Sequence, residues 1–438
     1  MSRTGLTKWL YFGLHIKRWL ALLVVSVAIM GLGLAYLLRE VYVTYTFPEW
    51  AYWATLQFIP RWARGLLFIS GASTLAVFAG WRLNRSLAEA VAPQVRGGDL
   101  IDLVYARRTQ ERGPRIVAIG GGTGLSNLLR GIKRYSSNLT AIVTVADDGG
   151  SSGRLRRDLQ VIPPGDIRNC IAALADAEPL VTELFQYRFR EGDGPAEGVG
   201  GHAFGNLFIA AMAGVTGSME DAIAETSRVL AVRGRIVPST LEDIVLGARM
   251  RDGSTVRGES RIPASGLPPE EVFIEPHDAP AHPAAVRALL EADLIVIGPG
   301  SLYTSVLPNL LVPGLGRALK ESRAYTILVT NVATQRGETN GFSAADHYTA
   351  VRRHLGAERL VDAVLANSNL PATPFPPLWG AEPVHAHGDD DYAGARLVLA
   401  DLVDEQRRLR HDAEKLASAV MRLYFERDLR IRAEALVP

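Results

Sequence analysis

Two long uncharged stretches lie in the N-terminal part of this chain. Residues 19–38 form a run of twenty without a charge, and residues 65–81 form a second uncharged run of seventeen. A helix of twenty residues rises about 30 Å, which matches the hydrocarbon core of a bilayer. The pattern therefore predicts a membrane hairpin in residues 1–83, with transmembrane helices at 19–38 and 65–81.

Two other interpretations of these runs are a signal peptide for the first and a buried helix for the second. A signal peptide is disfavoured because the first run is long and a second apolar run follows it. The second run contains the polar residues Ser70, Ser73 and Thr74, so a helix buried in a protein core stays an alternative for it.

The distribution of basic residues predicts the orientation in the membrane. These residues are denser outside the two runs than between them, which predicts both ends in the cytoplasm. We expect a two-pass protein of the cell (inner) membrane with its main domain in the cytoplasm.

After a polar juxtamembrane linker at 84–114, short apolar runs alternate with helical patterns. The apolar runs predict strands at 115–119, 140–146, 294–297, 326–330 and 361–366. Repeated strand, loop and helix units predict an α/β fold, with a Rossmann-like parallel sheet and helices on both faces, over residues 115–400. Short alternating runs at 236–276 predict a small β-rich insertion.

Two helices in this part of the chain bear on function. One is predicted at 166–175, with Asp166 as its N-cap. The other is a charged C-terminal helix at 401–438, in which leucines recur every seven residues from Leu402 to Leu423. The rest of the heptad is mostly polar, so packing on its own domain is favoured and a homodimer helix stays open.

Composition changes this picture little. The chain has 438 residues and a formal net charge of +1, so no basic field indicates nucleic acid as a partner. Cys170 is the single cysteine, which excludes an intramolecular disulfide and a cysteine-rich zinc site. The letters of the G-x-S-x-G pattern occur once, at Gly149–Gly153, but we do not interpret them as a nucleophile elbow, and hydrolysis by a serine nucleophile finds little support.

A glycine-rich loop follows the first predicted strand. It contains Gly121, Gly122, Thr123 and Gly124 between the strand and a helix. Backbone N–H groups and a helix N-terminus at such a place favour a phosphate or pyrophosphate. The loop is neither a P-loop nor a complete G-x-G-x-x-G fingerprint. A tight turn without a ligand stays open.

The next strand runs into paired carboxylates, Asp147 and Asp148, and then into Ser151, Ser152 and Arg154. The carboxylates suit a ribose hydroxyl, or a Mg²⁺ ion held between them and a diphosphate. The hydroxyls and the guanidinium suit phosphate. A solvated turn is the alternative for the two aspartates.

A second glycine loop follows the strand at 294–297. Gly300, Ser301 and Thr304 lie there, and Asn331 ends the next strand. As in the first loop, glycines and hydroxyls between a strand and a predicted helix N-terminus favour a phosphate. Asn206, in the motif G-H-A-F-G-N-L, suits either the edge of a base or a capping role.

Five motifs occur in a fixed order: A-I-G-G-G-T-G-L-S, V-T-V-A-D-D-G-G-S-S-G-R-L, P-P-G-D-I-R, G-N-L-F-I-A-A and D-L-I-V-I-G-P-G-S-L-Y-T-S-V-L-P-N-L-L. Together they closely resemble the gluconeogenesis factor family (YvcK-like proteins), which is related to the CofD 2-phospho-L-lactate transferases. The resemblance covers about residues 115–399. It implies a Rossmann-like fold and binding of UDP-sugars, notably UDP-N-acetylglucosamine, with a part in cell shape and growth on gluconeogenic carbon; we extend this to a link with carbon metabolism and cell-wall synthesis. The membrane hairpin lies outside the compact soluble members of that family.

The resulting hypothesis is a membrane-tethered regulator that binds a nucleotide sugar. The alternative is a CofD-type, Mg²⁺-dependent transferase acting on a nucleotide-diphosphate-linked donor, and an NAD-dependent enzyme is disfavoured by the imperfect fingerprint. No catalytic residue is assigned, and Asp147 and Asp148 are the candidate metal ligands. The candidate ligand-binding residues are Gly121, Gly122, Thr123, Gly124, Asp147, Asp148, Ser151, Ser152, Arg154, Asp166, Asn206, Gly300, Ser301, Thr304 and Asn331.

Overall fold

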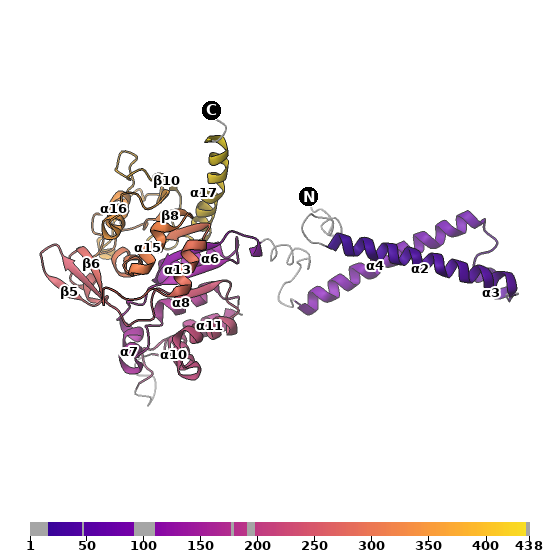
Figure 1. The fold of residues 1–438 in the computed structure, drawn as a ribbon, viewed down its shortest axis with the longest axis horizontal. Helices are drawn as coiled ribbons and strands as arrows, with labels where there is room; N and C mark the ends of the chain where they lie inside the picture. The colour runs from indigo at the N-terminus through magenta and orange to yellow at the C-terminus, as the bar shows by residue number, and fades with distance from the viewer. Residues whose placement is uncertain (1–15, 46–47, 92–109, 177–178, 191–197, 435–438) are drawn as a thin grey trace. The chain divides into compact units, whose positions relative to one another are not determined.

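The computed structural model describes residues 16–45, 48–91, 110–176, 179–190 and 198–434. The chain divides into two compact units, Met1–Thr109 and Gln110–Pro438. The first unit contains α2 (Ile16–Thr44), α3 (Glu49–Ala54) and α4 (Arg61–Val91) (Figure 1). Its described apolar side chains are largely exposed, as Met30 (69%) and Tyr36 (70%) illustrate.

One helix among the described residues is long and apolar enough to cross a membrane. It is the segment Arg61–Ala79 of α4, which has a mean hydropathy of 1.4 and no buried share. The other predicted span, residues 19–38, lies within α2 but does not pass the same test over its described residues. One candidate span is therefore supported, and the hairpin of two stays a prediction.

The second unit is built on a seven-stranded sheet with the order β10-β9-β8-β7-β1-β2-β3. All its strand pairs are parallel. Numbered consecutively, this order reads 7-6-5-4-1-2-3 and contains the Rossmann arrangement. The strands are β1 (Ile116–Gly120), β2 (Leu139–Val143), β3 (Arg235–Pro238), β7 (Leu294–Ile297), β8 (Tyr325–Val329), β9 (Ala363–Asn367) and β10 (Arg396–Ala400).

Two groups of helices flank this sheet. One group packs around α6 and the other around α13 to α16. The strands β1 and β7 are buried along their whole length, as expected for strands covered on both faces. The predicted parallel sheet with flanking helices is thus confirmed. The helices are α6 (Gly122–Ile132), α7 (Gly150–Leu159), α8 (Gly165–Leu174), α9 (Pro179–Gln186), α10 (Phe204–Thr216), α11 (Met219–Val229), α13 (Pro283–Glu291), α14 (Leu307–Leu310), α15 (Pro313–Glu321), α16 (Ala344–Leu355) and α17 (Ala413–Glu434).

The insertion is a separate antiparallel sheet of three strands, β4 (Val245–Met250), β5 (Thr255–Arg257) and β6 (Pro269–Glu275). The predicted insertion at 236–276 begins too early in the chain. Its first residues belong to β3, which pairs in parallel with β2 in the main sheet. A short run of four residues carried no signal that could separate a main-sheet strand from the insertion.

The C-terminal helix begins at Ala413, twelve residues later than predicted. Residues before it form a loop in which Asp404 accepts hydrogen bonds from the backbone of Gln406 and Arg407. The helix packs against α6 of its own unit. Leu416 is fully buried whereas Leu409 is 40% exposed, so the leucine repeat does not form one continuous stripe.

Candidate functional site

A cavity of about 220 Å³ lies at the carboxyl ends of β1, β7 and β8. Because β1 pairs with β2 on one side and β7 on the other, this is the point where strand order reverses. Ligands of open α/β sheets bind at such a point. Seven of the predicted site residues line the cavity, namely Gly121, Gly122, Thr123, Gly124, Gly300, Ser301 and Asn331.

The first glycine loop requires its glycines for two distinct reasons. Gly122 has a φ of +61°, a conformation that side chains other than glycine rarely adopt. A Cβ on Gly124 would lie 2.5 Å from the carbonyl oxygen of Pro299, so the two glycine loops approach each other closely. These residues begin α6, so its free N–H groups and positive helix end face the cavity. Such an end favours a phosphate.

The second glycine loop is held in place by side chains from the segment after β8. The Asn331 side chain accepts from the backbone N–H of Gly300 (3.2 Å) and donates to its carbonyl (2.9 Å). Ser301 Oγ donates to the Gln335 side chain at 2.7 Å. Asn331 and Ser301 therefore shape the cavity wall as well as lining it.

Thr304 lies behind this wall. Its hydroxyl donates to the carboxylate of Glu338 at 3.1 Å, and the backbone N–H of Tyr303 also points at Glu338. Glu338 is fully buried, and burial raises its pKa to about 7. Thr304 thus supports the loop and does not line the cavity.

Positive charge collects on one wall of the cavity, where Arg410 is part of the lining. Burial, followed by the charges of Arg407 and Arg410, lowers the pKa of Arg130, so positive charge from these side chains acts on Arg130. Arg130 donates to the side chain of Asn127, another lining residue. Sequence reasoning missed this wall because it placed residues 401–412 in a helix. The basic run R-R-L-R at 407–410 was the available signal.

The carboxylates of Asp147 and Asp148 point to different partners. Asp147 accepts from the backbone N–H of Gly149 at 2.9 Å, and Asp148 accepts from that of Ser260 at 2.9 Å. Burial raises the pKa of Asp147, while hydrogen bonds from Gly149 and Ser152 lower it. Ser152 therefore acts on Asp147, and each of the two aspartates has a backbone partner of its own.

Asp166 links these carboxylates to the cavity. A Cβ built on Gly121 would collide with its carboxylate, so Asp166 lies directly behind the first glycine loop. Burial, followed by the charge of Asp147, raises its pKa to about 7. The predicted N-cap role is wrong, because Pro164 holds the cap position and Asp166 lies in the first turn of α8.

A further acid, Glu259, comes from the insertion and was not predicted. Burial raises its pKa to about 8, and the charges of Asp147 and Asp166 add to the shift. The insertion therefore brings a proton-holding carboxyl to the same cluster. A single glutamate in a loop 93 residues after Asp166 carried no sequence signal of this proximity.

The remaining predicted residues form an internal network. Ser151 Oγ accepts from the Asn206 side chain (3.0 Å) and from the backbone of Ala203 (3.4 Å), so its own proton is directed at His202 Nδ1 at 3.1 Å. The Arg154 guanidinium donates to the carbonyl of Gly200 at 3.0 Å. Ser151, Arg154 and Asn206 are not among the residues that line the cavity.

No group of three or more His, Cys, Asp or Glu residues in the described parts of the chain could hold a metal ion. Asp147 and Asp148 stay the predicted ligands of a Mg²⁺ ion, which enzymes commonly hold by one or two carboxylates together with substrate phosphates.

Comparisons with known proteins agree with this architecture. The family model described as 2-phospho-L-lactate transferase CofD matches residues 116–387. A Nostoc sp. protein named "Putative gluconeogenesis factor" is 46% identical over 425 residues, covering 95% of this chain and 92% of its own length. The "Gluconeogenesis factor" of Bacillus subtilis is 45% identical over 318 residues, covering 72% and 99%.

A crystal structure of a Bacillus halodurans protein matches with a TM-score of 0.67 and 45% identity, covering 70% of this chain and 99% of that one. The relatives thus fall into two lengths. The shorter ones match about the extent of the second unit, which indicates that this unit folds without the first. The Nostoc match extends over most of the N-terminal unit, so that unit is shared with other relatives.

Proposed function

The chain belongs to the gluconeogenesis factor family and carries a CofD-type domain, and from this premise we propose that it binds a nucleotide-diphosphate sugar of the UDP-N-acetylglucosamine type. The protein acts as a regulator that links carbon metabolism to cell shape and cell-wall synthesis. The cavity between the two glycine loops carries this proposal. The cavity is lined by a helix N-terminus, glycine backbone and Arg410, and it lies where the strand order of the sheet reverses.

In this proposal the diphosphate lies against Gly121–Gly124 at the start of α6, with Arg410 opposite. Guanidinium groups and helix N-termini are both suited to phosphate oxygens. The nucleoside or sugar hydroxyls extend toward Asp166 and Asp147, behind the first loop. Carboxylates there are acceptors for ribose hydroxyls, as in dinucleotide folds.

A CofD-type transferase is the second candidate, favoured by the family model over residues 116–387. The carboxyls of Asp166 and Glu259, with pKa values raised to about 7 and about 8, could accept or release a proton near neutral pH. Such an enzyme would use Asp147 and Asp166, together with the donor diphosphate, to hold Mg²⁺. The metal would supply charge stabilisation of the leaving phosphate.

We also propose that the first unit tethers the protein to the cell membrane, with the second unit in the cytoplasm. The apolar and exposed segment Arg61–Ala79 supports this, as do the exposed apolar side chains of α2. Membrane fractionation of the full chain tests the tether. Recovery of the chain in the soluble fraction would refute it.

Thermal-shift titration of residues 110–438 tests the ligand. It compares UDP-N-acetylglucosamine, GDP with Mg²⁺, and NAD. We expect stabilisation by the UDP-sugar without turnover. A response only to GDP with Mg²⁺, accompanied by transfer of a donor group, would favour the transferase, and a response only to NAD would refute both.

Two variants place the ligand in the cavity. Arg410→Gln removes the cation that lines it, whereas Arg408→Gln removes the same charge from the same loop beside a different cavity. Charge-assisted hydrogen bonds contribute about 1.5–3 kcal/mol, so we expect the first variant to weaken binding about 10- to 100-fold and the second to leave it nearly unchanged. Equal effects would contradict the placement.

A further inference from the structure

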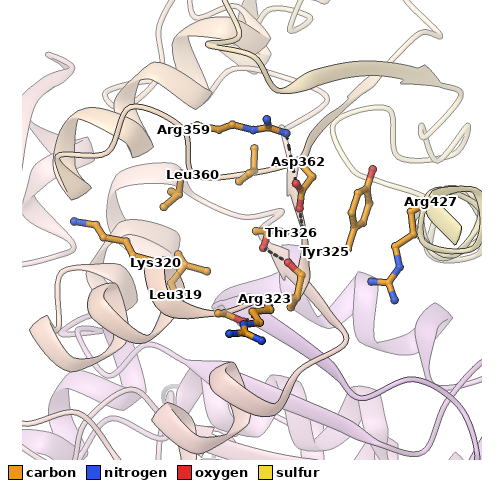
Figure 2. Close-up of a pocket in the computed structure, with 12 residues that line it drawn as sticks. Leu319, Lys320, Arg323, Tyr325, Thr326, Arg359, Leu360, Asp362 and Arg427 are labelled. Atoms are coloured by element: carbon orange, nitrogen blue, oxygen red, sulfur yellow. Dashed lines mark hydrogen bonds and ion pairs between the residues drawn. The ribbon is translucent and has the colours of Figure 1, made fainter. Parts of the chain in front are cut away.

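A second cavity lies at the other edge of the sheet, and neither glycine loop lines it. Its volume is about 630 Å³, and it opens at the amino ends of β8 and β9 beside Tyr325, Thr326 and Asp362 (Figure 2). In a parallel sheet the amino and carboxyl ends of the strands lie at opposite edges. This cavity, here called the amino-edge pocket, is therefore separate from the proposed nucleotide site.

The amino-edge pocket is basic. Its lining includes Lys320, Arg323, Arg359 and Arg427 but only one acid, Asp362. Arg359 pairs with Asp362 at 3.5 Å, and that carboxylate also accepts from the backbone N–H of Thr326 at 2.8 Å. The single acid is therefore already engaged by the protein.

Two of the cations keep their charge available. Lys320 lies in the last turn of α15 and Arg323 follows the end of that helix, and both are exposed. Within the parts of the chain that the structure describes, neither forms an ion pair with a carboxylate. Figure 2 shows Arg323 on the side of the hollow opposite Arg359, and Lys320 at the left, with its ammonium pointing outward. An anion approaching the pocket would therefore meet exposed positive charge on both sides.

The second unit begins at Gln110, and this residue lies at the same amino edge of the sheet. The Gln110 side chain accepts from Arg233 and donates to the Arg134 carbonyl, both at 3.0 Å, which fixes the incoming chain beside the amino end of β1. Arg115 then pairs with the Asp293 carboxylate at 2.9 Å. The Asp293 carbonyl in turn accepts from Arg427 of the amino-edge pocket at 2.8 Å. The incoming chain and the pocket are thus joined through Asp293.

We propose that the amino-edge pocket binds the phosphate-bearing headgroup of an anionic lipid, so that this edge of the second unit rests on the membrane surface. The proposal rests on the tether of the proposed function, because the tether brings this edge to the bilayer. Basic residues near an anionic leaflet each strengthen attachment. The ring of Tyr325 and the side chain of Leu360 add a partly apolar wall, as suits the interface. The nucleotide cavity, at the opposite edge, stays open to the cytoplasm.

Vesicle co-sedimentation of residues 110–438 tests this without the hydrophobic helices. The vesicles contain phosphatidylcholine alone, or phosphatidylcholine with phosphatidylglycerol. We expect binding to the anionic vesicles alone. The double variant Lys320→Gln/Arg323→Gln should bind about 25-fold more weakly, about fivefold per charge. The control Arg157→Gln/Arg251→Gln removes two exposed charges elsewhere and should change binding less than threefold.

Free glycerol phosphate and inorganic phosphate distinguish a lipid from a soluble anion. Millimolar glycerol phosphate should compete only weakly with vesicles. Absence of vesicle binding, equal losses in the two double variants, or full displacement by millimolar free phosphate would each overturn the proposal. The Lys320→Gln/Arg323→Gln variant should keep its thermal response to UDP-N-acetylglucosamine. Failure at this pocket is therefore distinguishable from failure of the nucleotide site.

Discussion

Replacing Asp166 by asparagine should stabilise the ligand-free protein, and more so as the pH rises. Asp166 lies behind the first glycine loop next to Asp147, and burial and that neighbouring charge raise its pKa from 3.8 to about 7. A raised pKa means that the folded state holds its proton more tightly than the unfolded chain. The stability that this proton contributes is complete below pH 3.8 and is lost as the pH rises through about 7.

The rise in the pKa of Asp166 from 3.8 to about 7 sets an upper value of about 4 kcal/mol, because a tenfold change in an equilibrium corresponds to about 1.4 kcal/mol. Because Asp166 is only half-buried by accessible surface, solvent screens part of this cost. We expect about 2 kcal/mol of extra stability for Asp166→Asn at pH 8 and almost none at pH 4. An asparagine oxygen can still accept from the backbone N–H of Gly122 that now serves the carboxylate.

Urea unfolding of residues 110–438 across pH 4–8 measures this difference. Asp278→Asn, at an exposed position, is the matched control and should run parallel to wild type. A variant that is destabilised equally at every pH, or whose pH slope equals that of wild type, would refute the raised pKa assigned to Asp166.

Three further predictions concern the frame of the site. Asn331→Ala removes two hydrogen bonds to the second glycine loop and should lower the free energy of unfolding by about 1–3 kcal/mol, measured in urea. Gly124→Ala places a Cβ 2.5 Å from the facing carbonyl; the loops must separate, so the thermal response to UDP-N-acetylglucosamine should disappear while the sheet still unfolds cooperatively. Leu416→Ala, at a fully buried position, should cost about 2–5 kcal/mol, whereas Leu409→Ala, which is 40% exposed, should cost less than about 1. Equal costs would contradict the packing of α17.

The strands and the glycine loops were predictable because their signals are local. The strand at β7 (Leu294–Ile297) agrees with the prediction at both ends, since buried parallel strands are continuous apolar runs. The loop at Gly121–Gly124 follows from glycine between a strand and a helix. By contrast, β10 (Arg396–Ala400) was not predicted. The strand has only five residues, and most of its side chains are half-buried.

The contents of the site were harder to predict because they depend on tertiary contacts. Arg410 reaches the cavity only because residues 401–412 form a loop, and the charged composition there equally suits a helix. Glu259 joins the carboxylates through the insertion. Ser151 and Asn206 were predicted as ligand contacts, and the structure gives each a partner within the protein. Whether they also contact a ligand stays a prediction.

Hydrogen–deuterium exchange with and without UDP-N-acetylglucosamine tests the central claim most directly. We predict that the ligand slows exchange at the backbone amides of residues 121–124 and 300–301, which line the cavity in its two glycine loops. Residues 320–326, beside the amino-edge pocket, should exchange at unchanged rates. Protection at residues 320–326 with none at the glycine loops, or no protection anywhere at saturating ligand, would contradict the account.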